Sequence, residues 1–375
     1  MSLFRLRGEL SKSQNILLGI GGFVILILIW WALAESLAIK NPIVDYEKHP
    51  PSAFDTTGVK IDRDSLFRED SIRFANATEF EKIYPMFPLP SAVIKSYPEL
   101  VKSKEKGGDN LFYHVKRSVW MNFKGYFWAV FLAVPLGFLI GLVPMFRGLF
   151  SKQVDAMRFL PLTALTGLFI IWFGLEDQMK VAFLAFGIIV FLLPVVVQRI
   201  DEVKDVYLKT SFTLGATSWQ TIRTIYLPSV FSVLMDDIRV LTAISWTYII
   251  VAELLNKQGG VGDLIFIQRR QGRVDKMFAI LIVIVIIGFL QDRLFAYLDK
   301  RLFTHKYYKT RLQGIKETEY GIFMLLTLFA FAVLIPLFLS NVPAIMSSIA
   351  TIIIITAIVI IFYGEFKIWQ ARKTE

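Results

Sequence analysis

Long apolar runs separated by short polar stretches dominate this chain of 375 residues. A helix of about 20 apolar residues crosses the hydrocarbon core of a bilayer. By that measure the sequence predicts eight membrane spans, at residues 15–35, 118–145, 155–174, 180–198, 230–254, 276–297, 320–340 and 344–363. Because 55% of the residues are hydrophobic and the mean hydropathy is +0.55, we expect an all-α polytopic membrane protein. The first run has no small-residue cleavage pattern, so we expect it to remain as an anchor.

Basic residues gather in those polar stretches that the predicted spans place on one side of the membrane. They are Arg5, Arg7, Lys12, Arg147, Lys152, Arg158, Lys300, Arg301, Lys306, Lys309, Arg311, Lys316, Lys367, Arg372 and Lys373. Since Lys and Arg are enriched in cytoplasmic loops, both termini are predicted to be cytoplasmic. Five basic residues between spans five and six disagree, namely Lys257, Arg269, Arg270, Arg273 and Lys276. The net charge of +10 is therefore mostly a topology signal, and we expect no nucleic-acid partner.

The predicted spans divide the chain into five parts. These are 1–35, a cytoplasmic tail and first span; 36–117, an extracytoplasmic segment; 118–299, a core with a cytoplasmic loop at 199–228; 300–319, a basic cytoplasmic linker; and 320–375, an additional hairpin of spans with a cytoplasmic tail. No charged residue occurs from Gly321 to Gly364, which favours packing against lipid or an accessory subunit over a solute path.

The loop from Lys204 to Pro228 has a helical pattern of its own. Apolar residues recur at helical spacing on both sides of Gly215: Val203, Val206, Tyr207 and Leu214 before it, and Trp219, Ile222, Ile225 and Tyr226 after it. Thr217 or Ser218 is suited to cap the second helix, and glycine permits a sharp bend. Pro228 disfavours helix at Leu227 and suits the first turn of the next span. We predict two short amphipathic helices joined at Gly215.

The spacing within this loop resembles the E-A-A-x-x-x-G-x9-I-x-L-P pattern of bacterial ABC importer permeases. Gly215, Ile225, Leu227 and Pro228 match, Ala216 is typical, and Lys209, Thr210 and Ser211 stand where the family has Glu-Ala-Ala. The resemblance implies that the loop seats in a groove on a separate ATPase subunit. The reversed charge at Lys209 alters the expected details of that contact.

Other stretches extend the resemblance over roughly residues 86 to 300. Span three, FLPLTALTGLFIIWFGLED, matches a family stretch, and Trp246, Ala252 and Glu253 resemble the W-x5-A-E signature of the nitrate/sulfonate/taurine/bicarbonate branch. Gly259, Gly260 and Gly262 follow in a turn like the S-G-L-G of that branch. The resemblance implies a six-helix, type I-like permease core, here followed by a two-helix hairpin, with about eight spans in all.

The resemblance also implies partners and a location. Two permease copies, most simply a homodimer, would form one pathway for a small anionic solute in the bilayer of the bacterial inner membrane. Two ATPase subunits would dock on the loops, and an extracytoplasmic solute-binding protein would deliver the solute. The long segment 36–117 is either a docking platform for that protein or packs on the outer loops.

Motifs for chemistry on this chain are missing from the sequence. A P-loop would need G-x4-G-K-[ST], and none is present, so we expect no cofactor on this chain and ATP-Mg on the partner ATPase. There is no cysteine, and His49, His114 and His305 are scattered over predicted loops, so no metal site is expected. We therefore predict a translocation subunit without catalytic residues.

Six residues are candidates for the solute pathway or its gate: Thr163, Thr166, Gly167, Asp236, Arg239 and Glu253. Proline and glycine favour an irregular third span, and such backbone is tolerated where protein or a water-filled path surrounds it. The alternative is that the threonines bond to other helices or to their own backbone. Asp236 and Arg239 are three residues apart and able to form a structural or gating ion pair. Glu253 near the outer mouth either gates the path, contacts the binding protein, or is a plain interfacial acid.

A competing hypothesis is an anchoring or scaffold subunit of a larger membrane complex that kept the permease architecture. Three features motivate it: the Lys209-Thr210-Ser211 triplet, the enlarged outer segment and the two additional spans.

Overall fold

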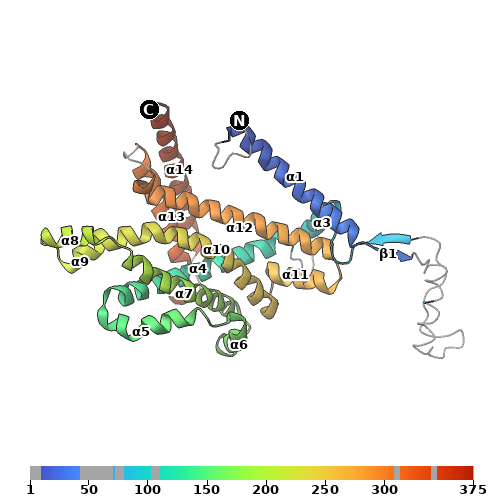
Figure 1. Cartoon of the computed structure of the whole chain (residues 1–375), viewed down its shortest axis with the longest axis horizontal. Coiled ribbons are helices and arrows are strands. Elements are labelled where there is room, and N and C mark those ends of the chain that lie inside the picture. Colours follow the sequence, from blue (N-terminus) through green and yellow to red (C-terminus); the bar gives the residue numbers. More distant parts are fainter. Residues whose placement is uncertain are drawn as a thin grey trace. The chain divides into compact units, whose positions relative to one another are not determined.

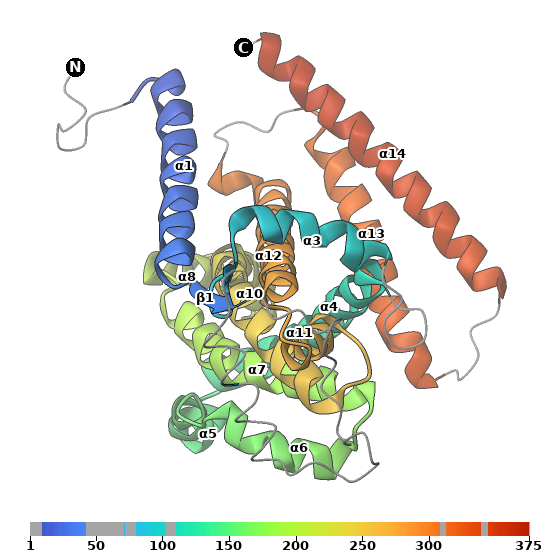
Figure 2. The ribbon, with the colours of Figure 1, turned by 90° about the vertical axis from the view of Figure 1, so that its right-hand side faces the viewer.

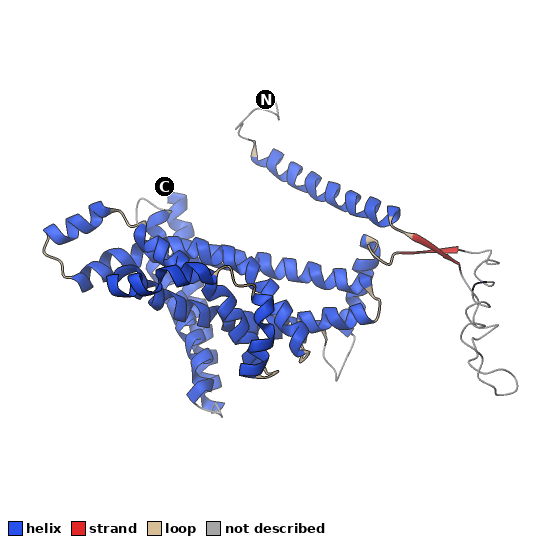
Figure 3. Ribbon diagram, turned by 60° about the horizontal axis from the view of Figure 1, so that its bottom comes forward, coloured by secondary structure: helices blue, strands red, loops and turns tan. Residues whose placement is uncertain are grey.

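The structure is a computed structural model, and it describes residues 10–42, 71, 80–102, 110–307, 313–338 and 344–374. Within that part of the chain helices dominate, and two short strands form the sheet (Figure 3). Seven helices are long and apolar enough to cross a membrane, or eight spans if a bent helix pair counts as one. This confirms the predicted all-α polytopic architecture. The expectations for His49, Lys309, Arg311 and most of the segment 36–117 concern positions outside the described residues.

The elements follow one another along the chain with few long gaps (Figure 1). They are α1 Lys12–Ser36, β1 Ile39–Pro42, β2 Phe80–Ile83, α3 Pro90–Lys102, α4 Leu111–Leu142, α5 Pro144–Met157, η1 Leu162–Leu165, α6 Thr166–Phe173, α7 Asp177–Asp201, α8 Asp205–Thr213, α9 Ser218–Thr221, η2 Ile222–Tyr226, α10 Leu227–Asn256, α11 Val261–Arg270, α12 Val274–Leu302, η3 Thr304–Lys306, α13 Ile315–Phe338 and α14 Ala344–Thr374. They form two compact units, residues 1–103 with 267–281, and residues 104–266 with 282–375.

The smaller unit joins the end of α1 to the strands and to the start of α12. Strands β1 and β2 pair antiparallel, with Ile39 opposite Ile83. The Trp30 indole donates a hydrogen bond to the Pro88 carbonyl (2.9 Å), and its ring contacts Phe278 with centroids 5.8 Å apart. Glu99 lies 3.2 Å from the Lys276 ammonium, so an acid of the outer segment neutralises one of the basic residues that disagreed with the topology signal. These two strands were not predicted from the sequence pattern.

The core of the larger unit is the packing of α4 and α10 against α7. Helix α4 presents glycines to α7: a Cβ at Gly125 would lie 2.4 Å from Leu184, and one at Gly137 would lie 2.5 Å from Val196. Only glycine allows this approach. Between spans in lipid there is no hydrophobic drive, so close packing across small residues supplies the attraction.

Buried amides and a hydroxyl connect α4, α10 and α12 within this core. Asn122 donates to the Ser245 hydroxyl (3.0 Å) and accepts from the Gln291 amide (3.3 Å). The Gln291 carbonyl oxygen in turn accepts from the Trp246 indole (2.9 Å). Because each of these groups is partnered, the polar side chains stabilise the helix bundle instead of penalising burial.

Two predicted span boundaries were wrong. Helix α4 starts at Leu111, seven residues before the predicted 118, because the Asn110 side chain accepts a hydrogen bond from the Tyr113 amide and caps the helix there. The predicted third span, 155–174, covers only the last residues of α5 together with η1 and α6, and α5 is bent by 97° from the η1–α6 piece. Proline at 161 lacks an amide hydrogen and restricts the residue before it, so the helix breaks at that point.

The C-terminal hairpin is a close pair of helices (Figure 2). A Cβ at Gly364 of α14 would lie 2.3 Å from the Thr318 hydroxyl of α13, and Lys367 forms a 2.7 Å ion pair with Glu317. Helix α13 is fixed to α4 by Phe329, whose ring lies 6.0 Å from that of Trp120. The hairpin is therefore attached to the core by aromatic packing.

The glycine contacts lead to the first prediction. Gly125→Leu should destabilise the protein by about 1–3 kcal/mol, because added methylenes force a packed core apart. Thermal unfolding in detergent measures the loss. The control is Gly148→Leu, because a Cβ at Gly148 on α5 meets no atom within 4 Å. Equal losses in both variants would contradict the packing argument.

Candidate functional sites

The loop between α7 and α10 is held by a local turn at Gly215. Gly215 has a φ of 75°, its amide donates to the Phe212 carbonyl, and the Ala216 amide donates to the Ser211 carbonyl. These two bonds form a Schellman motif, which closes the C-terminus of α8 and requires a left-handed residue. Glycine adopts this conformation without steric cost. The conformation explains why the loop pattern has glycine at this position.

Side chains lock the two arms of this loop together. The hydroxyls of Ser211 on α8 and Thr221 on α9 are buried and lie 2.9 Å apart. Thr217 caps α9, with reciprocal bonds between its own groups and those of Gln220. Ser211 therefore has a structural partner in the loop.

The second arm is not a separate helix, which corrects the sequence prediction. Leu227 is helical, and α9, η2 and α10 run on as one helical segment from Ser218 to Asn256. Residues 222–226 form a π turn directly before Pro228. A π turn changes the hydrogen-bond register, so the missing amide of proline is accommodated without breaking the helix.

The loop exposes a large apolar surface. We call loop surface the residues Val206, Tyr207, Phe212, Leu214 and Trp219, whose exposed fractions range from 54% to 82%. The other apolar residues that recur at helical spacing in this loop do not belong to the loop surface. They are partly buried, namely Val203, Ile222, Ile225 and Tyr226. Lys209 is exposed beside this surface.

A groove of about 730 Å³ lies next to the loop surface. Its lining includes Thr210, Ser211, Ala216, Ile225 and Pro228 from the predicted site, together with Tyr207 and Leu214. Leu227 is partly buried and does not line the groove. Glu202 at the rim of the groove stays ionised, because the hydrogen bond from Arg199 lowers the pKa of its carboxyl group. An exposed apolar surface with a groove marks a site for protein contact.

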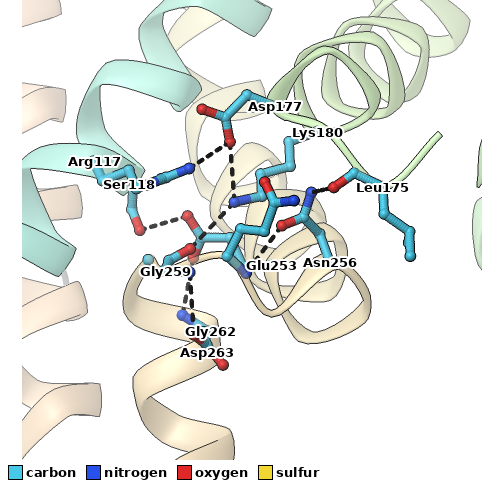
Figure 4. A network of polar contacts seen from close by, with 12 residues as sticks. Arg117, Ser118, Leu175, Asp177, Lys180, Glu253, Asn256, Gly259, Gly262 and Asp263 are labelled. Atoms are coloured by element: carbon cyan, nitrogen blue, oxygen red, sulfur yellow. Dashed lines mark hydrogen bonds and ion pairs between the residues drawn. The ribbon is translucent and has the colours of Figure 1, made fainter. Parts of the chain in front are cut away.

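At the other end of α10, Glu253 is fully buried in a polar network (Figure 4). The Ser118 hydroxyl of α4 donates to one carboxylate oxygen (2.6 Å), and the Gly262 amide of α11 donates to the other (2.9 Å). Ser118 also accepts from the Val261 amide (2.8 Å). One carboxylate thus joins α4, α10 and the turn into α11.

Glycine is required in that turn by the approach of the carboxylate. A Cβ at Gly260, where φ is 115°, would lie 2.2 Å from Glu253, and a Cβ at Gly262 would lie 2.6 Å from the Ile250 carbonyl. His114 also reaches the turn, with Nδ1 3.0 Å from the backbone of Gly260. His114 therefore sits in helix α4, not in a loop as the sequence suggested.

Charges around Glu253 are balanced in pairs. Asp177 at the start of α7 accepts from Arg117 (2.8 Å) and lies 3.3 Å from the buried ammonium of Lys180. Lys180 also donates to the Gly259 carbonyl (3.2 Å). Glu253 and Lys180 are fully buried, whereas Asp177 is 37% exposed, so Glu253 itself has no exposed surface in this conformation.

The remaining candidate residues lie in two places. Thr163 and Gly167 are exposed around η1 and α6, and the Thr166 hydroxyl donates to the Thr163 carbonyl (2.9 Å), which is the backbone bond that the sequence offered as an alternative. Asp236 and Arg239 lie in the first half of α10, about 25 Å and about 21 Å from Glu253 along the helix at 1.5 Å per residue. The structure therefore does not bring the six candidates into one site.

Arg239 and Asp236 do pair, but their shorter contacts are with other helices. Their closest approach is 3.7 Å, whereas Arg239 lies 3.0 Å from Asp292 of α12 and Asp236 lies 3.1 Å from Lys306. Arg199 of α7 holds Asp237 with two bonds of 2.7 and 2.8 Å. The charged residues of these contacts that the sequence did not predict as site residues are Arg199 and Asp292 and, at the other end, Arg117, Asp177 and Lys180. The feature that could have identified these residues in the sequence is a charge at the edge of an apolar run.

Membrane-length helices, a broken span and an exposed, locally bonded loop between α7 and α10 define a multi-span membrane protein. Residues 133–304 match the family described as binding-protein-dependent transport system inner membrane component. This range contains the loop, the groove and Glu253, and the hairpin α13–α14 lies outside it.

Several relatives share this part of the chain. The putative aliphatic sulfonates transport permease protein SsuC of Bacillus subtilis is 27% identical over 220 residues, 58% of this chain and 77% of that protein. The taurine transport system permease protein TauC of Escherichia coli is 22% identical over 299 residues, 80% of this chain and 93% of that protein. A putative ABC transporter permease protein of Methanocaldococcus jannaschii is 29% identical over 199 residues, 52% of this chain and 72% of that protein. Residues 133–304 of this chain are therefore similar to the binding-protein-dependent inner-membrane components, and the relatives that match this part of the chain are named as permease proteins.

The buried carboxylate gives the second prediction. Glu253→Ala should lower the free energy of unfolding by about 2–4 kcal/mol, because it leaves the Gly262 amide unpaired and opens a cavity. Thermal unfolding in detergent measures the loss. The control Glu176→Ala removes an exposed acid that makes no capping bond at the start of α7. A loss no larger than that of the control would refute the anchoring role.

The ion pair between α10 and α12 gives the third prediction. Asp292→Arg alone should destabilise the protein, because it faces Arg239 with a like charge. The double variant Arg239→Asp with Asp292→Arg should recover at least half of that loss, since the attraction is restored with its sign reversed. A double-mutant cycle from unfolding data tests this. Additive losses would show that the contact carries no coupling energy.

Proposed function

We propose that this chain is the membrane permease of an importer whose ATP-Mg is bound by separate ATPase subunits, one on each loop of a pair of permeases. The observation that carries the proposal is the loop surface. Five large apolar side chains project from a loop that local bonds already hold in one shape. An ordered apolar surface outside the spans is suited to a preformed protein contact with little ordering cost.

The loop is connected rigidly to the bundle. The Gly215 turn and the Ser211–Thr221 contact fix α8 to α9, and α9 continues into α10 without a break. A displacement of the loop by a partner would therefore move the start of α10 directly. The ion pairs of Arg199 with Asp237 and of Arg239 with Asp292 would be the first contacts to respond. This is how ATPase motion would bias the permease between two states.

In this proposal, a second copy of the permease forms the solute pathway together with the first. On α10, Val233, Val240, Ala243 and Thr247 are exposed and recur at helical spacing. Thr163 and Gly167 around η1 and α6 are exposed as well. We assign these faces to the contact between two copies and the path for solute. Asp236 and Arg239 would stabilise its cytoplasmic gate, and Glu253 would act by holding the outer ends of α4, α10 and α11 together.

The solute in this proposal is a small sulfonate-like anion, delivered by an extracytoplasmic binding protein. The support is the names of the relatives, an aliphatic sulfonate permease and a taurine permease. The protein would lie in the bacterial inner membrane with both termini in the cytoplasm. This orientation is supported by the basic residues flanking the spans on the side of the loop.

The test is a change at Gly215, which is the fourth prediction. A side chain at a φ of 75° costs about 1–2 kcal/mol, so Gly215→Val should distort the Schellman turn and displace Leu214. We expect the purified variant to lose its ATPase partner and solute-stimulated ATP hydrolysis while two permease copies still assemble. Mass spectrometry of co-purified proteins and phosphate release are the measurements.

The matched control is Gly148→Val, on an exposed and open position of α5. It should keep both the ATPase subunit and stimulated hydrolysis. Retention of both by Gly215→Val would reject docking through this loop. An unmutated chain that purifies without any ATPase, in mild detergent, would reject the importer proposal itself.

A further inference from the structure

A second cavity, of about 700 Å³, lies among α4, α6, α7 and α13 on the side of the hairpin. Aromatic and aliphatic side chains form its walls, among them Trp120, Trp128, Phe169, Trp172, Phe186 and Pro336. All four helices belong to predicted spans or to the broken span, so the cavity lies at membrane depth. It is separate from the loop groove and from the network around Glu253.

The Lys124 side chain faces this cavity and has no carboxylate as an ion-pair partner in the part of the chain that the structure describes. Lys124 of α4 lies in the lining and is half-buried, and its ammonium is 5.6 Å from the Trp120 ring centroid. Within the described part of the chain it makes no hydrogen bond or ion pair. The nearest acid in the lining, Asp177, is already held by Arg117 and Lys180. Among the described residues, Lys124 therefore has no carboxylate as an ion-pair partner.

The position of Lys124 along α4 is at the edge of the apolar run. No charge follows it until Arg147, and on α7 no charge separates Lys180 from Arg199. Lys124 and Lys180 thus mark the same boundary between hydrocarbon and headgroups. From there the lining continues inward through Leu132, about 12 Å deeper at 1.5 Å per residue. The cavity has a charged entrance and an apolar interior.

We propose that the cavity binds an anionic phospholipid, with the phosphate at Lys124 and an acyl chain between α6, α7 and α13. A half-buried ammonium at the edge of the hydrocarbon is costly without an anion beside it, and a phosphate offsets that cost. The apolar walls suit an acyl chain, and the volume is within the range of small-molecule sites. Helix α13 supplies one wall, so the lipid ties the hairpin to the core. This inference is independent of the proposed function.

The test uses the purified full chain, with native mass spectrometry during titration of palmitoyl-oleoyl phosphatidylglycerol or phosphatidylcholine. A lysine near the membrane surface contributes about 1 kcal/mol toward anionic lipid, so wild type should prefer phosphatidylglycerol about fivefold. Lys124→Gln should lose that preference, whereas Lys124→Arg should keep it. Lys116→Gln is the matched control, because Lys116 is exposed on α4 and outside the cavity.

A second variant distinguishes lipid binding in the cavity from a general attraction of anionic lipid by surface charge. Ala332→Trp places a ring into the cavity from an exposed position of α13 and leaves Lys124 intact. Ala332→Trp should reduce phosphatidylglycerol binding as much as Lys124→Gln does. If Lys124→Gln does not fold, Ala332→Trp alone tests whether the lipid binds in the cavity. Unchanged lipid preference in both variants would overturn the proposal. Displacement of the lipid by an equal concentration of octanesulfonate would also overturn it, by assigning the cavity to a solute anion.

Discussion

The close contact of α7 with α4 across glycine is the constraint on which the rest of this structure depends. In lipid, apolar surface gains nothing by leaving its surroundings, so helices are stabilised by packing and by internal polar bonds. Gly125 and Gly137 allow Leu184 and Val196 to approach α4 where any side chain would collide. With α7 fixed, its C-terminus sets where the loop begins, and α10, packed on the same helix, sets where it ends.

Features that depend on near neighbours were predictable from the sequence. The turn at Gly215 is closed by bonds from amides to carbonyls only three and five residues away, and the Thr217 cap acts on Gln220. Such motifs have the same geometry in any fold, so their residue pattern is informative. The break near Pro161 follows from the same local reasoning, although its 97° angle does not.

Features that depend on distant partners were not predictable. The sequence suggested Asp236 as the partner of Arg239 because they are three residues apart, yet Asp292, 53 residues later, lies closer. Glu253 was recognised as a signature residue, but its burial depends on Ser118, 135 residues earlier in the chain. The π turn before Pro228 is a third case, because the local rules for proline favour a helix break there, and the structure instead continues the helix through the changed hydrogen-bond register of residues 222–226.

The two ends of α10 differ in what it would cost to move them. At the loop end, Asp236 is 53% exposed and Asp292 is 38% exposed, and ion pairs in contact with water contribute about 0–1 kcal/mol. At the other end the carboxylate of Glu253 is buried with both oxygens bonded, and breaking a buried contact of this kind costs several times more. A force applied at the loop therefore separates the contacts of Arg239 and Asp236 before it disturbs those of Glu253.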